Sequence, residues 1–291
     1  MSKNNSELAG SIMLLIAAIV WGFSFAFQSM GGESLGPFSF NSIRYFIGAA
    51  ALLPVIAVKK RRGDYPDGRA FGENEIKGGL SCGLCLAGAS YLQQYSLLFN
   101  QSGKVGFITA LYVVCVPVAA FLIYGKKTGT KIIISVILAG IGLWLLCGDS
   151  SFSAGLGDIP AYLCMLGFTF HILLIDKWTG RADGVVMSCI QFIVAGAAGG
   201  IIALFTETFS VQAFADSLVS LLYCGVMSCS VAYTLQMVFQ RDVPPAKASV
   251  IMSLESVFSV VGGWIILGEV LSGKQLIGCG AMLAAIILAQ L

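Results

Sequence analysis

The chain carries one stretch twice, as KVGFITALYVVCVPVAAFLIYGKKTGTK at residues 104–131 and as KASVIMSLESVFSVVGGWIILGEVLSGK at residues 247–274. Sliding the first over the second by 143 positions gives eight identities in 28 positions without a gap. At nearly the same offset, Tyr91 lies over Tyr233. A repeat of this length is the signature of an internal duplication. The sequence therefore predicts two related halves.

The composition places both halves in lipid. Hydrophobic residues make up 57% of the 291 residues and charged residues 11%, whereas soluble domains carry about a quarter charged residues. About 20 apolar residues form a helix that crosses a bilayer. We therefore predict an all-α membrane protein with ten spans, near residues 9–29, 38–58, 76–99, 103–124, 131–148, 156–176, 184–206, 216–239, 245–267 and 274–290.

The number of spans in each half has a mechanical consequence. Residues 1–148 and residues 149–291 each hold five predicted spans, and an odd number places the second half upside down relative to the first. Inverted repeats of this kind let many secondary transporters open alternately to the two sides of the membrane. We expect transport by alternating access. A membrane scaffold or sensor that transports nothing is the alternative.

The basic residues indicate the orientation. With a cytoplasmic N-terminus, fourteen lysines and arginines lie at inner ends and loops, and only Lys104 and Lys274 lie outside. This positive-inside bias predicts a plasma (inner) membrane protein with both termini in the cytoplasm. Residues 59–62 form a basic cluster expected to contact anionic membrane lipids, or to bind a specific lipid. The net charge of +2 gives no sign of nucleic-acid binding.

Several loose motifs of small and apolar residues are shared with a known family, namely Trp21-Gly22, Arg44, Leu254-Glu255, Gly262-Gly263-Trp264 and Lys274-Gln275-Leu276-Ile277-Gly278. With them the whole chain resembles the EamA-like drug/metabolite transporters. The resemblance implies a ten-helix inverted-repeat carrier in a bacterial or archaeal inner membrane, often an exporter of amino acids or other small metabolites. One position departs from the family pattern, because Ser256 rather than proline follows Glu255.

Glu255 is the first candidate for function. It lies near the centre of a predicted span, where a charged carboxylate costs about 2.5 to 3.5 kcal/mol on insertion scales. It must therefore face a partner, water or a substrate. Because desolvation disfavours the charged form, we expect Glu255 to couple transport to protons or to hold a cationic or amino group. A protonated glutamate bonded between helices is the alternative.

Arg44 is the second candidate. It lies about two turns inside a predicted span, close enough to the surface for its long side chain to reach the interface. It is alternatively placed to hold a substrate carboxylate with two hydrogen bonds, or to neutralise Glu255 across a cavity. The repeat puts Gln191 opposite Arg44. We therefore expect the two halves to make different contacts with the substrate.

Two pairs of neutral side chains are further candidates for the substrate site. Tyr91 with Gln94, and Tyr233 with Gln236, each place a phenol and an amide three residues apart on one helical face. Such groups can line a polar cavity and bind a small zwitterion. Hydrogen bonding between helices is an equally good explanation.

Aromatic residues and the only histidine complete the set. Trp21, Phe25 and Tyr112 are candidates for an aromatic wall around the substrate, with packing as the alternative. His171 is the only histidine and is either a proton relay or a packed, hydrogen-bonded side chain. Cys82 and Cys85 form a Cys-x-x-Cys string, but no further ligands are expected near them, so we predict no metal and no cofactor.

Enzyme motifs in the sequence are incomplete. Residues 155–158 match the Gly-x-Gly-Asp string of intramembrane aspartyl proteases, but Asp158 has no second aspartate inside a preceding span. Residues 268–274 resemble a phosphate loop, but Gln275 stands where serine or threonine is needed. We therefore expect no enzyme activity.

Together these features predict a secondary carrier for a small polar molecule. We expect export of an amino acid or related compound, by facilitated or proton-coupled exchange. Uptake of an organic cation such as a quaternary amine is the alternative, with Glu255 as its counter-charge. The small-molecule substrate, protons and membrane lipids are the expected partners. The sequence leaves substrate, direction and a monomeric or homodimeric state open.

Overall fold

The computed structural model describes residues 3–291 except 66–68, 101, 148–154, 156, 269 and 271. The predicted boundary between the halves, at residues 148 and 149, lies outside the described residues. Within them the secondary structure is helical, without a strand. The elements are α1 (Lys3–Ser34), α2 (Pro37–Arg61), α3 (Glu73–Ser96), α4 (Ser102–Ala110), α5 (Tyr112–Tyr124), α6 (Thr130–Cys147), α7 (Asp158–Trp178), α8 (Gly184–Thr206), α9 (Val211–Asp216), α10 (Leu218–Leu222), η2 (Tyr223–Tyr233), α11 (Thr234–Phe239), η3 (Gln240–Asp242), α12 (Pro245–Met252), α13 (Glu255–Leu267) and α14 (Gly273–Gln290).

Helix is present in every one of the ten predicted stretches. Eight segments of the described chain are long and apolar enough to cross a membrane, and α6 contains a shorter apolar helix. The remaining stretch, α3, buries several polar side chains, among them Ser90, Gln93 and Gln94. The protein is therefore a multi-pass, all-helical membrane protein.

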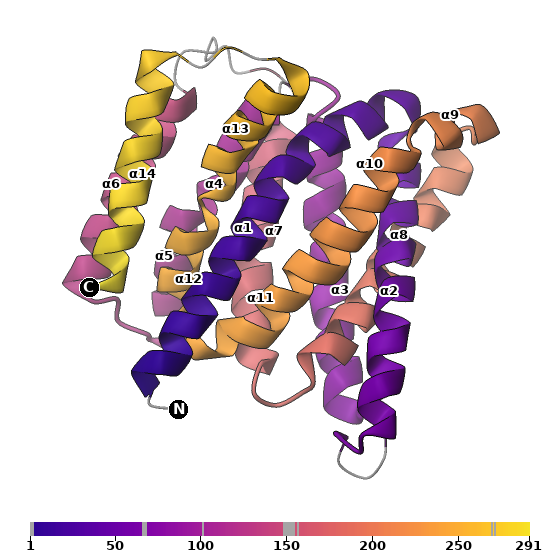
Figure 1. The fold of residues 1–291 in the computed structure, drawn as a ribbon, viewed down its shortest axis with the longest axis horizontal. Coiled ribbons are helices and arrows are strands. Elements are labelled where there is room, and N and C mark those ends of the chain that lie inside the picture. The colour runs from indigo at the N-terminus through magenta and orange to yellow at the C-terminus, as the bar shows by residue number, and fades with distance from the viewer. Residues whose placement is uncertain are drawn as a thin grey trace.

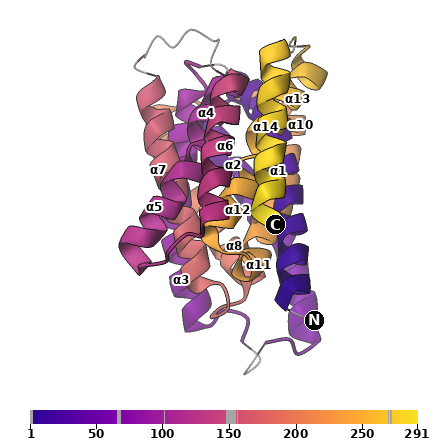
Figure 2. The same cartoon turned by 90° about the vertical axis from the view of Figure 1, so that its left-hand side faces the viewer.

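The helices run side by side as a bundle (Figure 1). Helices α6 and α14 pack against each other at one edge of the bundle, as Figure 2 shows from that side. At the other edge α8 packs against α2 and α3, while α1 contacts α13 and η2 between the two edges. The N and C ends of the chain lie toward the same end of the bundle (Figure 1).

Polar groups contribute to the contacts between helices beside a core of buried hydrophobic side chains. In lipid, apolar burial adds little drive for helix association, so packing and hydrogen bonds carry it. The Ser42 hydroxyl donates to the Gly196 carbonyl at 2.8 Å, and the Asn41 amide donates to the Ser90 carbonyl at 3.0 Å. These bonds fix α2 against α8 and α3.

Two segments are broken in the middle at equivalent places. Helix α4 ends at Ala110 and α5 begins at Tyr112, and in the second half α12 ends at Met252 and α13 begins at Glu255. The second break forms although Ser256 occupies the position of the family's proline. Leu111 and Leu254 keep right-handed helical dihedral angles, and the Val114 and Ser256 N–H groups donate to the Leu111 and Ser253 carbonyls. Each interruption is therefore a tighter turn within one continuous segment.

The broken segments also end alike. Gly125 follows α5 and Gly268 follows α13, with φ of 64° and 71°. This left-handed conformation is easy for glycine and costly for other residues. Because the two glycines are 143 positions apart, the repeat seen in the sequence has the same backbone in both halves.

The π-helix η2 interrupts one segment of the second half between α10 and α11. The Ser230 hydroxyl lies 2.9 Å from the Gly48 carbonyl and 3.3 Å from the Gly225 carbonyl, and so occupies backbone acceptors at this point. Each π-turn holds one residue more than an α-turn, so the residues that follow are rotated about the helix axis. The corresponding helix of the first half, α3, is α-helical throughout.

Candidate functional site

A small cavity lies between the broken helices and the helices that face them. Its volume is about 40 Å³, enough for a few water molecules. Eight of the eleven residues predicted from the sequence are on its wall, namely Trp21, Phe25, Arg44, Tyr112, His171, Tyr233, Gln236 and Glu255. These residues come from both halves of the chain. The cavity is therefore the candidate substrate site.

Glu255 stands at the first turn of α13, directly after the break. Its side chain is buried, the residue being 7% exposed, and its Oε1 atom has no hydrogen-bond partner in the described residues. Tyr112 interacts with the same carboxyl group. The Ser256 and Phe258 N–H groups next to it donate to the Ser253 and Leu254 carbonyls, so the backbone here is hydrogen-bonded within the segment.

Gly22 lets α1 approach the backbone of α13 closely at Glu255 and Phe258. A Cβ atom at Gly22 would lie 2.7 Å from the Glu255 carbonyl oxygen and 2.3 Å from the Phe258 Cβ atom, which is closer than such atoms can pack. The Trp21-Gly22 motif thus has a physical reason. Glycine brings α1 against α13, and Trp21 then faces the cavity beside it.

Arg44 is buried inside the protein, at 2% exposed, and lines the cavity. Its guanidinium carbon lies 5.1 Å from the Tyr45 ring centroid and 5.9 Å from the Phe40 ring centroid. Its Nε atom has no hydrogen-bond partner, and no ion pair to Arg44 is found in the described part of the chain. The expectation that Arg44 reaches the membrane surface is therefore wrong, since packing against two rings holds it inward.

No ion pair joins Arg44 to Glu255 among the described residues. The interpretation in which these two groups neutralise each other is therefore not realised in this structure. Both charges nevertheless lie on the wall of one cavity. Holding a substrate anion stays a prediction for Arg44.

His171 connects the cavity to Gln191. Its Nε2 atom lies 3.0 Å from Gln191 Oε1, which can only accept, so that nitrogen donates. The imidazole ring also packs edge-on against the Tyr233 and Phe168 rings. Gln191 does not line the cavity itself. It acts on the site by orienting His171, and so differs in role from Arg44, its counterpart in the repeat.

Tyr91 and Gln94 lie away from the cavity wall. The Tyr91 hydroxyl donates to the Ala195 carbonyl at 3.0 Å, and Gln94 Nε2 donates to the Gln28 carbonyl at 3.1 Å. Hydrogen bonding between helices, the alternative for this pair, is what the structure has. The equivalent pair, Tyr233 and Gln236, does line the cavity.

The π-helix explains this difference. Because η2 rotates the residues that follow it, the second half presents Tyr233 and Gln236 to the cavity. In the uninterrupted α3 it is Gln93, one residue before Gln94, that faces the same space. Gln93 Nε2 donates to Thr109 Oγ1 at 3.3 Å.

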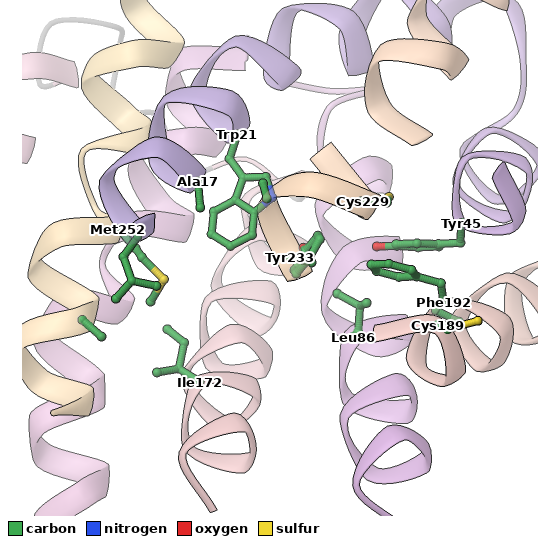
Figure 3. Close-up of a cluster of buried hydrophobic side chains, with 14 of the residues drawn as sticks. Ala17, Trp21, Tyr45, Leu86, Ile172, Cys189, Phe192, Cys229, Tyr233 and Met252 are labelled. Atoms are coloured by element: carbon green, nitrogen blue, oxygen red, sulfur yellow. The ribbon is translucent and has the colours of Figure 1, made fainter. Parts of the chain in front are cut away.

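Trp21 and Tyr233, which both line the cavity, lie next to each other in a buried cluster of hydrophobic side chains (Figure 3). Their ring centroids are 4.7 Å apart, and Trp21 Nε1 donates to the Ser228 carbonyl at 3.2 Å. This bond joins the first helix of the chain to the π-helix. Contacts between the two halves therefore hold the Trp21 side chain in place.

Polar residues on the wall that sequence reasoning missed are Ser24, Gln28, Gln93, Thr109 and Ser228. The sequence pattern could have predicted two of these residues, Ser24 and Gln28. Trp21, Ser24 and Gln28 recur at helical spacing on one face of an otherwise apolar helix. No cluster of three or more potential metal ligands occurs in the described residues, so the wall offers no evident metal site.

Membrane-spanning helices that enclose a cavity with charged and aromatic walls are an arrangement found in membrane transporters. A sequence model described as the EamA-like transporter family matches residues 8–148 and, separately, residues 155–291. The chain belongs to the EamA-like transporter family. Membership makes the protein a transporter and not an enzyme, as the sequence predicted.

Individual relatives agree with this assignment. An uncharacterized transporter from Archaeoglobus fulgidus is 28% identical over 286 residues, which cover 98% of this chain and 87% of that one. The threonine/homoserine exporter RhtA of Salmonella typhimurium is 29% identical over 214 residues, covering 70% and 67%. A solved crystal structure shares the fold, with a TM-score of 0.78 over 97% of this chain and 98% of that chain at 14% identity.

Proposed function

We propose that this transporter carries an amino acid, bound as a zwitterion with its carboxylate on Arg44 and its ammonium group on Glu255. The observation that carries the proposal is that two buried opposite charges share one cavity without pairing with each other. Each charge is costly at membrane depth. A zwitterion supplies both missing partners at once, and Arg suits the planar carboxylate group.

An organic cation is the weaker candidate. The aromatic wall of Trp21 and Tyr233 suits a quaternary amine, and Glu255 would be its counter-charge. The same cation would meet the buried charge of Arg44, which lines the same cavity. Like charges in such a space repel strongly. The presence of Arg44 therefore favours a substrate with a negative group.

The relatives support an amino acid and an outward direction. RhtA, to which this chain is similar over about two thirds of its length, is named as an exporter of threonine and homoserine. We propose export for this protein as well, from a cytoplasm that contains both chain termini, across a plasma (inner) membrane. The excess of basic residues on the proposed inner side supports this orientation.

We further propose that residues 1–148 and 149–291 are inverted five-helix repeats that move against each other. The separate matches of the family model to residues 8–148 and 155–291 support the two units. The helix contacts support the symmetry, since α1 packs on α13 as α7 packs on α4 and α5. Contacts of α3 with α7 likewise mirror those of η2 with α1.

Close contacts of two glycines obey the same symmetry. A Cβ atom at Gly83 would lie 3.0 Å from the Gln191 carbonyl oxygen, and one at Gly225 would lie 3.1 Å from the Arg44 carbonyl oxygen. Arg44 and Gln191 are the residues that the repeat sets opposite each other. Each half thus inserts its own glycine against the same point of the other half.

Two equivalent ion pairs are the proposed gates. Lys104 Nζ lies 2.7 Å from Asp158 at the start of α7, and Lys247 Nζ lies 2.8 Å from Glu7 in α1. The two lysines occupy matching positions of the repeat, and each binds the first helix of the opposite half. In inverted repeats such pairs lie at opposite ends. We propose that each pair breaks when its end opens.

The cavity volume supports a closed state. At about 40 Å³ the cavity is too small for an amino acid, so substrate enters only when the halves separate. A wider cavity of about 1110 Å³, whose wall includes Glu7, Lys126 and Lys247, is the proposed cytoplasmic vestibule. Opening the Lys247 pair would join the vestibule to the binding site.

Glu255 and His171 are the proposed proton carriers if transport is coupled. Both are buried, and both line the cavity. A glutamate that alternates between binding a proton and binding a substrate ammonium group would couple the two in exchange. If transport does not depend on pH, it is facilitated and not coupled to protons.

Counterflow in proteoliposomes tests the proposed function. Vesicles with purified protein are loaded with unlabelled threonine, and entry of radiolabelled threonine is measured against protein-free vesicles. We expect protein-dependent accumulation that changes with pH if protons are coupled. Accumulation of a labelled quaternary amine in place of threonine would favour the cation. If neither threonine nor the quaternary amine enters the vesicles in a protein-dependent way, the result would favour a membrane scaffold that transports nothing.

A further inference from the structure

A short chain of hydrogen bonds on α1 fixes the orientation of the Gln28 amide. The Ser24 hydroxyl donates its only proton to the Trp21 carbonyl at 2.8 Å. Its oxygen is then free to accept, and Gln28 Nε2 donates to it at 3.2 Å. The amide nitrogen therefore faces Ser24, and the amide oxygen is turned elsewhere.

That oxygen is buried without a partner. Gln28 is 2% exposed, and its Oε1 atom has no hydrogen bond in the described residues. A buried carbonyl oxygen without a donor is unfavourable, and such groups in native proteins call for an explanation. Gln28 also lines the substrate cavity. A molecule that enters the cavity is the available source of a donor.

Gln28 Oε1 is one of three unpartnered polar atoms on residues of this wall, with Arg44 Nε and Glu255 Oε1. They come from α1, α2 and α13. In the proposed function the two charged groups take the carboxylate and the ammonium group of the amino acid. The neutral acceptor, Gln28 Oε1, is then still without a donor. The side chain of the amino acid is the third substituent on its α-carbon and can supply one.

We infer that Gln28 selects amino acids whose side chain donates a hydrogen bond, such as a hydroxyl, by accepting that bond at its amide oxygen. This inference rests on the proposed function and deepens it. Gln93 and Thr109 extend the polar wall, with Gln93 Nε2 donating to Thr109 Oγ1. A site built to bond a hydroxyl group discriminates strongly against an analogue that lacks it.

Gln94 provides a matched control. It is also a buried glutamine with an unpartnered amide oxygen, and it touches the Gln28 backbone through its Nε2 atom. It does not line the cavity. A substitution there perturbs the same region of α1 and α3 without removing the acceptor from the site.

Competition between threonine and valine tests the inference, because valine replaces the hydroxyl of threonine with a methyl group. Each unlabelled amino acid competes with labelled threonine in counterflow, for the wild type, Gln28→Met and Gln94→Met. We expect the wild type to prefer threonine about tenfold, the contribution of one hydrogen bond. Gln28→Met should bring the ratio near one, and Gln94→Met should leave it unchanged.

The ratio remains informative if a variant folds poorly, since loss of active protein lowers both apparent rates together. Equal preference in the wild type, or an unchanged ratio in Gln28→Met, overturns the role of Gln28 while leaving an amino acid carrier. Absence of transport of any amino acid by the wild type overturns the proposed function and this inference with it.

Discussion

The two halves share a backbone and differ in chemistry at the site. Leu111 and Leu254 occupy the same place in the repeat, at the break of each interrupted segment. The next residue is Tyr112 in the first half and Glu255 in the second, and both line the cavity. The two halves thus share the interrupted segment, while the residue that follows the shared leucine differs in chemistry.

The cationic group shows the opposite asymmetry. Arg44 belongs to α2 of the first half, and its counterpart Gln191 is neutral and lies behind His171. The buried positive charge therefore comes from one half and the buried negative charge from the other. A zwitterion bound to both would be attached to each moving half, which offers a physical link between binding and rocking.

Removing the negative charge should have the largest effect. Glu255→Gln leaves the substrate ammonium group without its counter-charge, and the loss of one partner of a buried pair costs about 3 to 5 kcal/mol. We expect threonine counterflow to fall about 100- to 5,000-fold. Any residual flux should lose its pH dependence if Glu255 carries the coupling proton. Glu255→Asp, which keeps the charge, is the control and should retain more activity.

Making the halves alike at the cationic position should have the next largest effect. Arg44→Gln copies the residue at position 191 and removes a charge-assisted bond of about 1.5 to 3 kcal/mol. We expect the apparent affinity for threonine to fall about 10- to 100-fold in counterflow. Arg44→Lys keeps the positive charge but lacks the planar guanidinium group. Its apparent affinity for threonine should therefore lie between those of the wild type and Arg44→Gln. If the apparent affinity of Arg44→Gln for threonine is unchanged, Arg44 does not bind the substrate carboxylate.

Tyr112→Phe sharpens the comparison at the two breaks. It removes the hydroxyl that interacts with Glu255 and leaves the ring. One hydrogen bond contributes about 0.5 to 1.5 kcal/mol, so transport should fall about two- to tenfold. Purified protein in a thermal shift assay should show a similar melting temperature, because the ring remains packed. A loss as large as that of Glu255→Gln would give Tyr112 an essential role that the account does not assign.

The two gates should give the smallest and most symmetrical effects. Lys104→Met and Lys247→Met each break one partly buried ion pair, which is worth about 0.2 to 1 kcal/mol. We expect a cysteine introduced at Ser228, in a cysteine-free background, to react about two- to fivefold faster with a membrane-impermeant reagent. The increase should appear from opposite sides of the membrane for the two variants. Reaction from the same side in both would contradict inverted halves.

The sequence predicted the helical stretches because hydropathy over a span is a local property. The repeat also pairs Gly125 with Gly268, although the sequence analysis did not predict that both follow helix ends. Most of the candidate wall was found as well, partly because charged residues in an apolar span turn toward the protein interior.

Features that depend on packing between helices were not predictable. The π-helix η2, which turns Tyr233 and Gln236 toward the cavity, arises where Ser230 occupies backbone acceptors across the contact with α2. Because α3 has no such π-helix, Gln93 rather than Gln94 faces the site. Arg44 points inward because the Phe40 and Tyr45 rings hold it, which no spacing rule reveals.

In the proposed function one amino acid bridges Arg44 and Glu255. Competition by charge-modified substrates tests this bridge, with threonine methyl ester lacking the carboxylate and N-acetylthreonine lacking the ammonium group. In counterflow by the wild type, neither derivative should compete with labelled threonine, and Arg44→Gln should no longer distinguish threonine from its ester. If the ester competes as strongly as threonine in the wild type, one amino acid does not bridge the two residues.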